Sequence, residues 1–260
     1  MVIMVSMANR DEITEFCDQL LETSRFEPVE YGPNGLQVPG SKEVTRIASC
    51  VSANLASIEA AVAQGADLLL AHHGLFWKFQ TRVLSEQLAA RIKALLDADC
   101  SLLAYHLPLD AHPELGNNAL LCERLGFERG ESFASIDGVP IGWLGKIEDP
   151  LPTGEMTERI AELLDREPLV QGRVEGDIST MGFVSGGGTS FIYEAVEKGL
   201  DAMITGEPSE FAMATALEGN LAFYAAGHYA TETLGVRALG ELLADRFDVE
   251  HTFIDVPNPV

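Results

Sequence analysis

Apolar residues recur at helical spacing in several segments of the first half of the chain, and short unbroken apolar runs separate these segments. The helical spacing predicts helices at about residues 11–23, 56–64 and 85–98. The apolar runs predict strands at about residues 45–51, 68–71 and 102–105. Strands separated by helices of about ten to fifteen residues are typical of right-handed βαβ units, so the pattern predicts an α/β fold. Residues 34–40 are rich in turn-forming types and predict a loop.

The second half of the chain repeats the pattern of the first. Residues 58–67 align without gaps on residues 192–201, and the apolar runs that follow them match in character. A second, shorter match occurs farther along in the same order, which indicates duplicated halves. We therefore predict two similar α/β lobes with mostly parallel sheets, residues 1–128 and 129–260, with a boundary in the polar segment that begins at Glu128. The C-terminal segment of the second lobe can still pack on the first.

Composition limits the class of partner. The chain has 260 residues, of which 47% are hydrophobic, so it can bury a full core. Its 40 acidic and 17 basic residues give a formal net charge of -23, which disfavours nucleic acid and anionic membrane surfaces as partners. Because an acidic, lysine-poor surface suits a very salty cytoplasm, we hypothesise a halophilic source. Unfolding in low salt would support this hypothesis, and indifference to salt would contradict it.

Neither the cysteines nor the start of the chain indicates secretion. Cys17, Cys50, Cys100 and Cys122 show no paired spacing, so we expect buried free thiols and no disulfide scaffold or zinc ribbon. Residues 1–7 are apolar but lack the basic start and the long apolar run of a signal peptide. No stretch approaches the length of a membrane span. We expect a cytoplasmic protein.

Five of the six histidines fall in three places, each directly after a predicted strand. These places hold His72 with His73, His106 with His112, and His228. Open α/β sheets bind ligands at the carboxyl ends of their strands, so we expect the three groups along one sheet edge. Adjacent strand residues point to opposite faces, so His72 and His73 share a site only if the strand ends before them, which Gly74 permits.

Histidine and carboxylate together suit borderline divalent metals. His228 and Glu232 are four residues apart and face one ion if a helix begins near Thr231. Asp110 can bridge two ions, which would lower the pKa of a shared water. His106 is either a further ligand or a group that transfers protons to and from the substrate. We expect His112 to be a surface or hydrogen-bonding residue.

Three further features each leave two interpretations open. The backbone amides of Gly186, Gly187 and Gly188 can cradle a phosphate, or these glycines form only a tight turn. The aromatic residues Phe76, Trp77 and Phe79 can stack a flat base, or they pack in a core or subunit contact. Glu207 is either a carboxylate behind the metal ligands or a helix cap.

Taken together, these motifs resemble the Nif-three-like family of dinuclear metal proteins, described as type 2 homologues of GTP cyclohydrolase I. The resemblance rests on residues 67–77 with their His-His-Gly-Leu-Phe, on 105–118 with their His-Leu-Pro-Leu-Asp and Gly-Asn-Asn, on 227–239, and on the opening loop 34–38. It implies a Nif-three-like fold and a toroidal homohexamer. It also implies two divalent ions (zinc, iron or manganese) bound by His72, His73, Asp110, His228 and Glu232.

These features predict a metal-dependent hydrolase that acts on a small, nucleotide-like substrate. The resemblance names GTP ring opening with release of formate as the candidate reaction, with His106 as the catalytic acid and base. A metal-binding or metal-delivery protein without turnover is the alternative from another class. An interaction scaffold would explain a toroid but not the cluster of potential ligands.

Overall fold

The computed structural model describes residues 7–260, so the prediction made for residues 1–7 falls, apart from Met7, outside the described residues. The chain forms two compact units. Unit 1 contains the described residues up to Leu109 together with Gly235–Val256, and unit 2 contains Asp110–Leu234 and Pro257–Val260. The predicted boundary at residues 128 and 129 differs from this division. The chain returns to unit 1 because its last strand pairs with that unit's sheet.

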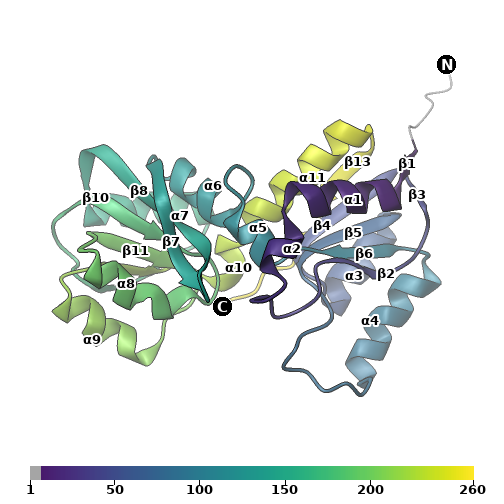
Figure 1. The fold of residues 1–260 in the computed structure, drawn as a ribbon, viewed down its shortest axis with the longest axis horizontal. Coiled ribbons are helices and arrows are strands. Elements are labelled where there is room, and N and C mark those ends of the chain that lie inside the picture. Colours follow the sequence, from purple (N-terminus) through teal and green to yellow (C-terminus); the bar gives the residue numbers. More distant parts are fainter. Residues whose placement is uncertain (1–6) are drawn as a thin grey trace. The chain divides into compact units, whose positions relative to one another are not determined.

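Unit 1 contains a five-stranded mixed sheet in the order β13-β4-β5-β6-β2 (Figure 1). All its pairings are parallel except the one between β2 and β6. A separate two-stranded sheet joins β1 to β3. The strands are β1 (Ala8–Asn9), β2 (Gly35–Val38), β3 (Glu43–Val44), β4 (Arg46–Ser52), β5 (Leu68–His73), β6 (Ser101–Ala104) and β13 (Glu250–Phe253). The helices are α1 (Arg10–Leu20), α2 (Thr23–Phe26), α3 (Leu55–Ala63) and α4 (Glu86–Asp97), while α5 (Leu107–Ala111) and α11 (Thr233–Phe247) each continue from one unit into the other.

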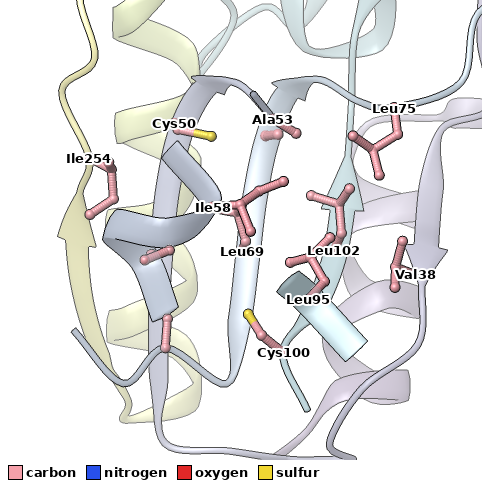
Figure 2. Packing of buried hydrophobic residues seen from close by; sticks show 14 residues of the cluster. Val38, Cys50, Ala53, Ile58, Leu69, Leu75, Leu95, Cys100, Leu102 and Ile254 are labelled. Carbon is pink, nitrogen blue, oxygen red and sulfur yellow. The ribbon is translucent and has the colours of Figure 1, made fainter. Parts of the chain in front are cut away.

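Helices α3 and α4 cover one face of this sheet, and α1 and α11 lie on its opposite face (Figures 1 and 2). Ile58 of α3 and Leu95 of α4 pack on Leu69 and Leu102 of the central strands, and none of these four side chains is exposed. Burial of such side chains stabilises each by about 1.5–3 kcal/mol relative to exposure. The periodicity of the sequence predicted both helices and both strands to within about two residues.

Two segments of unit 1 differ from the sequence prediction. The turn-rich stretch 34–40, predicted as a loop, contains strand β2, which pairs antiparallel with β6. Strand β5 includes both His72 and His73, so the prediction that the strand ends before them is wrong. Pairing with β6 stops at Ala71, whereas pairing with β4 continues to His73. The pair therefore occupies the end of the strand, where one side of the ladder has already finished.

Unit 2 contains a six-stranded sheet in the order β7-β8-β10-β11-β12-β9. Only β10, β11 and β12 pair in parallel, so this sheet does not fit the predicted mostly parallel arrangement. The strands are β7 (Glu128–Ile136), β8 (Val139–Pro152), β9 (Leu169–Gly172), β10 (Asp177–Phe183), β11 (Ala202–Thr205) and β12 (Ala222–Ala225). The helices are α6 (Asn117–Arg124), α7 (Thr153–Leu164), α8 (Ile192–Glu197), α9 (Glu210–Glu218) and α10 (His228–Thr231), with a 3-10 turn η1 at Gly188–Phe191.

The polar segment that begins at Glu128, where the sequence placed a boundary, is the edge strand β7 of a long hairpin. Its first five residues are exposed, and an edge strand with exposed residues has the polar composition of a loop. Among the residues that the structure describes, no helix is both long and apolar enough to cross a membrane.

The four cysteines are buried and free, as predicted. Burial raises the pKa of each thiol to about 12. They are therefore protonated and unreactive at neutral pH.

The repeat in the sequence has a structural counterpart at Asp67 and Asp201. Oδ2 of Asp67 accepts hydrogen bonds from the amides of Thr45 and Arg46 and from the Thr45 hydroxyl, at 2.8–3.0 Å. Oδ2 of Asp201 accepts the equivalent bonds from the Ser179 and Thr180 amides and the Thr180 hydroxyl, at 2.9–3.0 Å. Each aspartate ties the start of one parallel strand to its neighbour.

We expect Asp67→Ala and Asp201→Ala each to lower the free energy of unfolding by about 2 kcal/mol. Each substitution removes the hydrogen bonds to a charged carboxylate and leaves two backbone amides without their acceptor. Urea unfolding measures the loss. Asp97→Ala is the matched control, because Asp97 forms an exposed ion pair with Lys93. We expect loss of this pair to lower the free energy of unfolding by less than about 0.5 kcal/mol. Equal stability of the three variants would contradict this prediction.

Candidate metal centre

Three histidines of unit 1 form a cluster at the ends of β5 and β6. The ring centroids of His72 and His73 are 4.7 Å apart, and the His106 centroid is 5.1 Å from that of His72 and 5.5 Å from that of His73. One nitrogen of each ring lies within 4.8 Å of a nitrogen of the other two, which suits coordination of a metal ion. His106, predicted as a catalytic group, therefore lies beside two predicted ligands and shares their potential to bind metal.

His72 and His73 reach this cluster although they are neighbours within a strand. The His72 ring is fully buried and hydrogen-bonds through Nδ1 to the carbonyl oxygen of Tyr105, the residue after β6, at 3.0 Å. The His73 ring is held through Nδ1 by the hydroxyl of Ser52, its partner on β4, at 3.0 Å. The partner of His72 thus lies just beyond the last residue of β6, and that of His73 lies within β4.

The hydrogen bonds at Nδ1 decide which nitrogen can bind a metal. A carbonyl oxygen only accepts, so Nδ1 of His72 carries the proton and, in the neutral ring, the lone pair is on Nε2. The carboxylate of Glu30 fixes His106 in the same way, at 2.7 Å from Nδ1. Contacts of this kind orient histidine ligands and raise their basicity.

Glu30 holds one ring of the histidine cluster, and the sequence did not reveal this contact. It is 3% exposed and accepts hydrogen bonds from His106 Nδ1, Asn34 Nδ2, and the amides of Tyr31 and Leu107. Burial alone would raise the pKa of Glu30, but the hydrogen bond and charge of His106, with the hydrogen bonds of Asn34 and Tyr31, outweigh burial and lower it. Glu30 therefore stays ionised behind His106. In the sequence, the only feature that could have drawn attention to Glu30 is its position just before the loop at 34–38.

We expect Glu30→Gln to lower the free energy of unfolding by about 1–3 kcal/mol, because glutamine keeps one accepting oxygen and its NH2 group cannot accept from the N–H donors that Glu30 holds. Urea unfolding measures the loss. Glu27→Gln is the control because Glu27 is exposed. If both variants unfold as the wild type does, the hydrogen bonds of Glu30 do not stabilise the cluster.

Unit 2 carries a second set of potential ligands at α10. Nε2 of His228 lies 3.2 Å from Oε1 of Glu232, so the predicted proximity of this pair is present. On the other side of the ring, Nδ1 of His228 is 2.5 Å from Oε1 of Glu207, which the sequence left as either a carboxylate behind the ligands or a helix cap. Burial disfavours the charged ring, but the hydrogen bonds and charges of Glu232 and Glu207 outweigh it and raise the pKa of His228 to about 9.

Asp110 is 5% exposed in unit 2, and two side chains hold its Oδ1. The amide of Asn117 donates to it at 2.8 Å, and the hydroxyl of Ser185 donates at 2.9 Å. Asn118 supports the same region by accepting from the Ser185 amide at 2.6 Å. The Gly-Asn-Asn motif at 116–118 therefore positions a potential ligand. His112 caps the amides of Glu114 and Leu115 through Nδ1, which fits its predicted hydrogen-bonding role.

The glycine loop at 186–188 lies against the potential ligands of unit 2, and two of its backbone amides bond to threonine side chains. The amide of Gly186 donates to Thr231 Oγ1, and that of Gly188 donates to Thr205 Oγ1. A Cβ built on Gly186 would lie 2.3 Å from Oε1 of Glu232 and 3.2 Å from Nε2 of His228. The loop thus places a residue without a side chain next to two potential ligands. The side chain of any other residue at this position would fill the space beside them.

The donor sets of both units fit divalent metals. Unit 1 offers imidazole nitrogens, and unit 2 offers one imidazole with the carboxylates of Glu232 and Asp110. Nitrogen and carboxylate ligands of this kind accept zinc, iron or manganese. The arrangement can therefore hold divalent cations, whose positive charge would offset the negative charge of the protein and let an anion approach.

Comparison with known proteins places the chain among well-defined relatives. The family profile of Duf34/NIF3 (NGG1p interacting factor 3) matches residues 8–259. A protein named GTP cyclohydrolase 1 type 2 homolog from Allochromatium vinosum is 43% identical over 97% of this chain and 98% of its own length. One of the same name from Pseudomonas aeruginosa is 42% identical over 95% and 97%. A solved structure described as protein ybgI, of unknown function, is 41% identical, with a TM-score of 0.91 over 97% of this chain and all of the other.

Proposed function

Because the chain belongs to the Duf34/NIF3 family, we propose that it is a hydrolase that uses two divalent metal ions and acts on a nucleotide-like substrate. The curated relatives carry the name GTP cyclohydrolase 1 type 2 homolog, so ring opening of GTP with release of formate is the candidate reaction. The observation that carries the proposal is the anchoring of four histidines, His72, His73, His106 and His228, through Nδ1.

We assign His72, His73, Asp110, His228 and Glu232 as the metal ligands, divided between the two units. In support, the three imidazoles are each held by a hydrogen bond at Nδ1, and Asp110 is held through one carboxylate oxygen. Bound divalent ions supply a Lewis acid and lower the pKa of water. Ser52, Glu207, Asn117 and Ser185 orient the ligands so that little reorganisation is needed on binding.

His106 is the residue to which we assign proton transfer. With Nδ1 bonded to Glu30, its neutral ring accepts a proton at Nε2, and the resulting charged ring is stabilised by the carboxylate. The ring then donates the same proton to a leaving nitrogen. Its Nε2 is equally suited to metal coordination, so metal content and turnover must be measured on the same variant.

The test is release of formate from GTP by metal-loaded protein. We expect His106→Ala to abolish release and keep its metal content, whereas His112→Ala retains both. Full release by His106→Ala would refute its role in proton transfer, and loss of metal would make it a ligand. If no nucleotide is turned over while metal exchanges readily with a partner protein, the delivery function is correct and the hydrolase proposal fails.

For the assembly, we propose a homohexamer of toroidal form. Light scattering of the protein eluting from a size-exclusion column tests this directly, and a monomeric mass at micromolar concentration would contradict it. For the location, we propose the cytoplasm, which is consistent with four free thiols.

A further inference from the structure

A cavity of about 540 Å³ lies beside the histidine cluster in unit 1. Its walls come from Thr23 at the start of α2, Glu27 just after that helix, the loop at residues 30–34 and the loop at residues 76–78. A second, narrow cavity shares Gly32, Pro33, Asn34, Phe76 and Trp77 with the first and extends to His72 and His106. The larger cavity therefore adjoins the proposed metal ligands through the residues the two have in common.

The two loops that line the cavity are fixed to each other and to the cluster. The amide of Lys78 donates to the carbonyl oxygen of Tyr31 at 2.7 Å. A Cβ on Gly32 would lie 2.3 Å from the Phe76 carbonyl oxygen, so only glycine allows this approach. The Trp77 ring meets the His106 ring edge to face, at 5.2 Å and 88° between planes. The aromatic wall is thus preorganised against the histidines.

The lining combines flat apolar surface with a few polar groups. Phe76 and Trp77 supply aromatic surface, while Thr23, Glu27 and Lys78 supply a hydroxyl, a carboxylate and an ammonium group. The volume falls in the range of about 300–1,000 Å³ that is usual for small-molecule sites. Aromatic walls bind heteroaromatic bases by stacking, and a carboxylate accepts from their exocyclic amines. Lys78 can pair with an anionic substituent.

We propose that this cavity binds the purine-type base of the substrate, with Trp77 as the stacking wall and Glu27 as the acceptor for an amine of the base. The proposal rests on the hydrolase function proposed above and identifies where that substrate is held. It adopts, for Phe76 and Trp77, the base-stacking interpretation that the sequence left open. Phe79, which stacks on Trp77 at 5.7 Å, lies outside the lining.

The chain has only two tryptophans, Trp77 and Trp143, which allows a direct test of binding. Trp143 belongs to unit 2, where Arg129 lies over its ring at 4.6 Å. In metal-loaded Trp143→Phe, Trp77 is the sole indole. We expect guanosine and GMP to quench its fluorescence saturably and ribose 5-phosphate to leave it unchanged. Unchanged fluorescence with all three ligands would overturn the proposal.

Equilibrium dialysis with labelled guanosine provides a second measurement that needs no fluorophore. We expect Trp77→Leu to bind guanosine at least about 10-fold more weakly than wild type, as loss of one base–aromatic stack predicts, and Trp143→Phe to bind it normally. Metal content and thermal midpoint confirm that Trp77→Leu is folded. Normal binding by Trp77→Leu overturns the proposal even if formate is released. If Trp77→Leu binds guanosine weakly and the metal-loaded wild type releases no formate from GTP, the cavity proposal is supported and the hydrolase proposal is refuted.

Discussion

Replacement of His72 by alanine is expected to lower the affinity for divalent metal by more than about 100-fold, beyond the loss produced by an outer contact. His72 is fully buried, and its bond to the Tyr105 carbonyl leaves Nε2 as the nitrogen that can coordinate. Alanine offers no donor atom there and leaves His73 as the remaining assigned ligand of unit 1. Titration against a chromogenic chelator, together with elemental analysis of protein purified without a metal-binding tag, measures the change.

Thermal unfolding separates loss of metal from loss of fold. Any ligand that binds only the native state raises its stability, so zinc or manganese should raise the midpoint of the wild type and leave that of His72→Ala unchanged. His251→Ala is the matched control: His251 also belongs to unit 1, but its ring bonds to Ser49 Oγ at 2.8 Å and joins none of the potential metal groups in the described residues. A rise in the midpoint of His72→Ala as large as that of the wild type at the same metal concentration would show that this ring is no ligand.

Gly186→Ala should have the second-largest effect, on stability and on metal binding together. Gly186 has φ +60°, a conformation that costs an alanine about 1–2 kcal/mol. The added Cβ would also lie 2.3 Å from Oε1 of Glu232, so the carboxylate or the loop must move. We expect the free energy of unfolding in the presence of chelator to fall by at least the backbone cost. We also expect metal affinity to fall about 10-fold or more, because Glu232 is displaced.

The neighbouring glycine provides the control for this prediction. Gly187 has φ −84°, and a Cβ added to it would meet nothing within 4 Å, so Gly187→Ala tests the same chemical change without strain or collision. It should match or slightly exceed the wild type in urea unfolding, since alanine reduces the entropy of the unfolded chain. If the two variants behave alike, close approach of the loop to Glu232 has no functional consequence.

Features that depend on neighbouring residues could be predicted from the amino-acid sequence without any structure. Strands such as β11, at Ala202–Thr205, are short apolar runs because both faces of a central strand are buried. Duplication is visible in the sequence because residues 58–67 align without gaps on residues 192–201. In the structure, Asp67 and Asp201, which end these two segments, each accept hydrogen bonds from an equivalent pair of backbone amides. The histidines of the site were predictable too, since polar residues at the ends of buried strands are exceptions to the local pattern.

The folded chain was needed to show which distant residues serve the ligands and which segments share a unit. Glu30 meets His106 across 76 positions of the chain, and Ser185 meets Asp110 across 75, separations over which no local pattern carries information. The exposed edge strand β7 has the composition of a linker, and β13 belongs to unit 1 because its backbone pairs with β4. Local spacing encodes which face of an element is buried, whereas hydrogen-bond partners and sheet order depend on how the whole chain closes on itself.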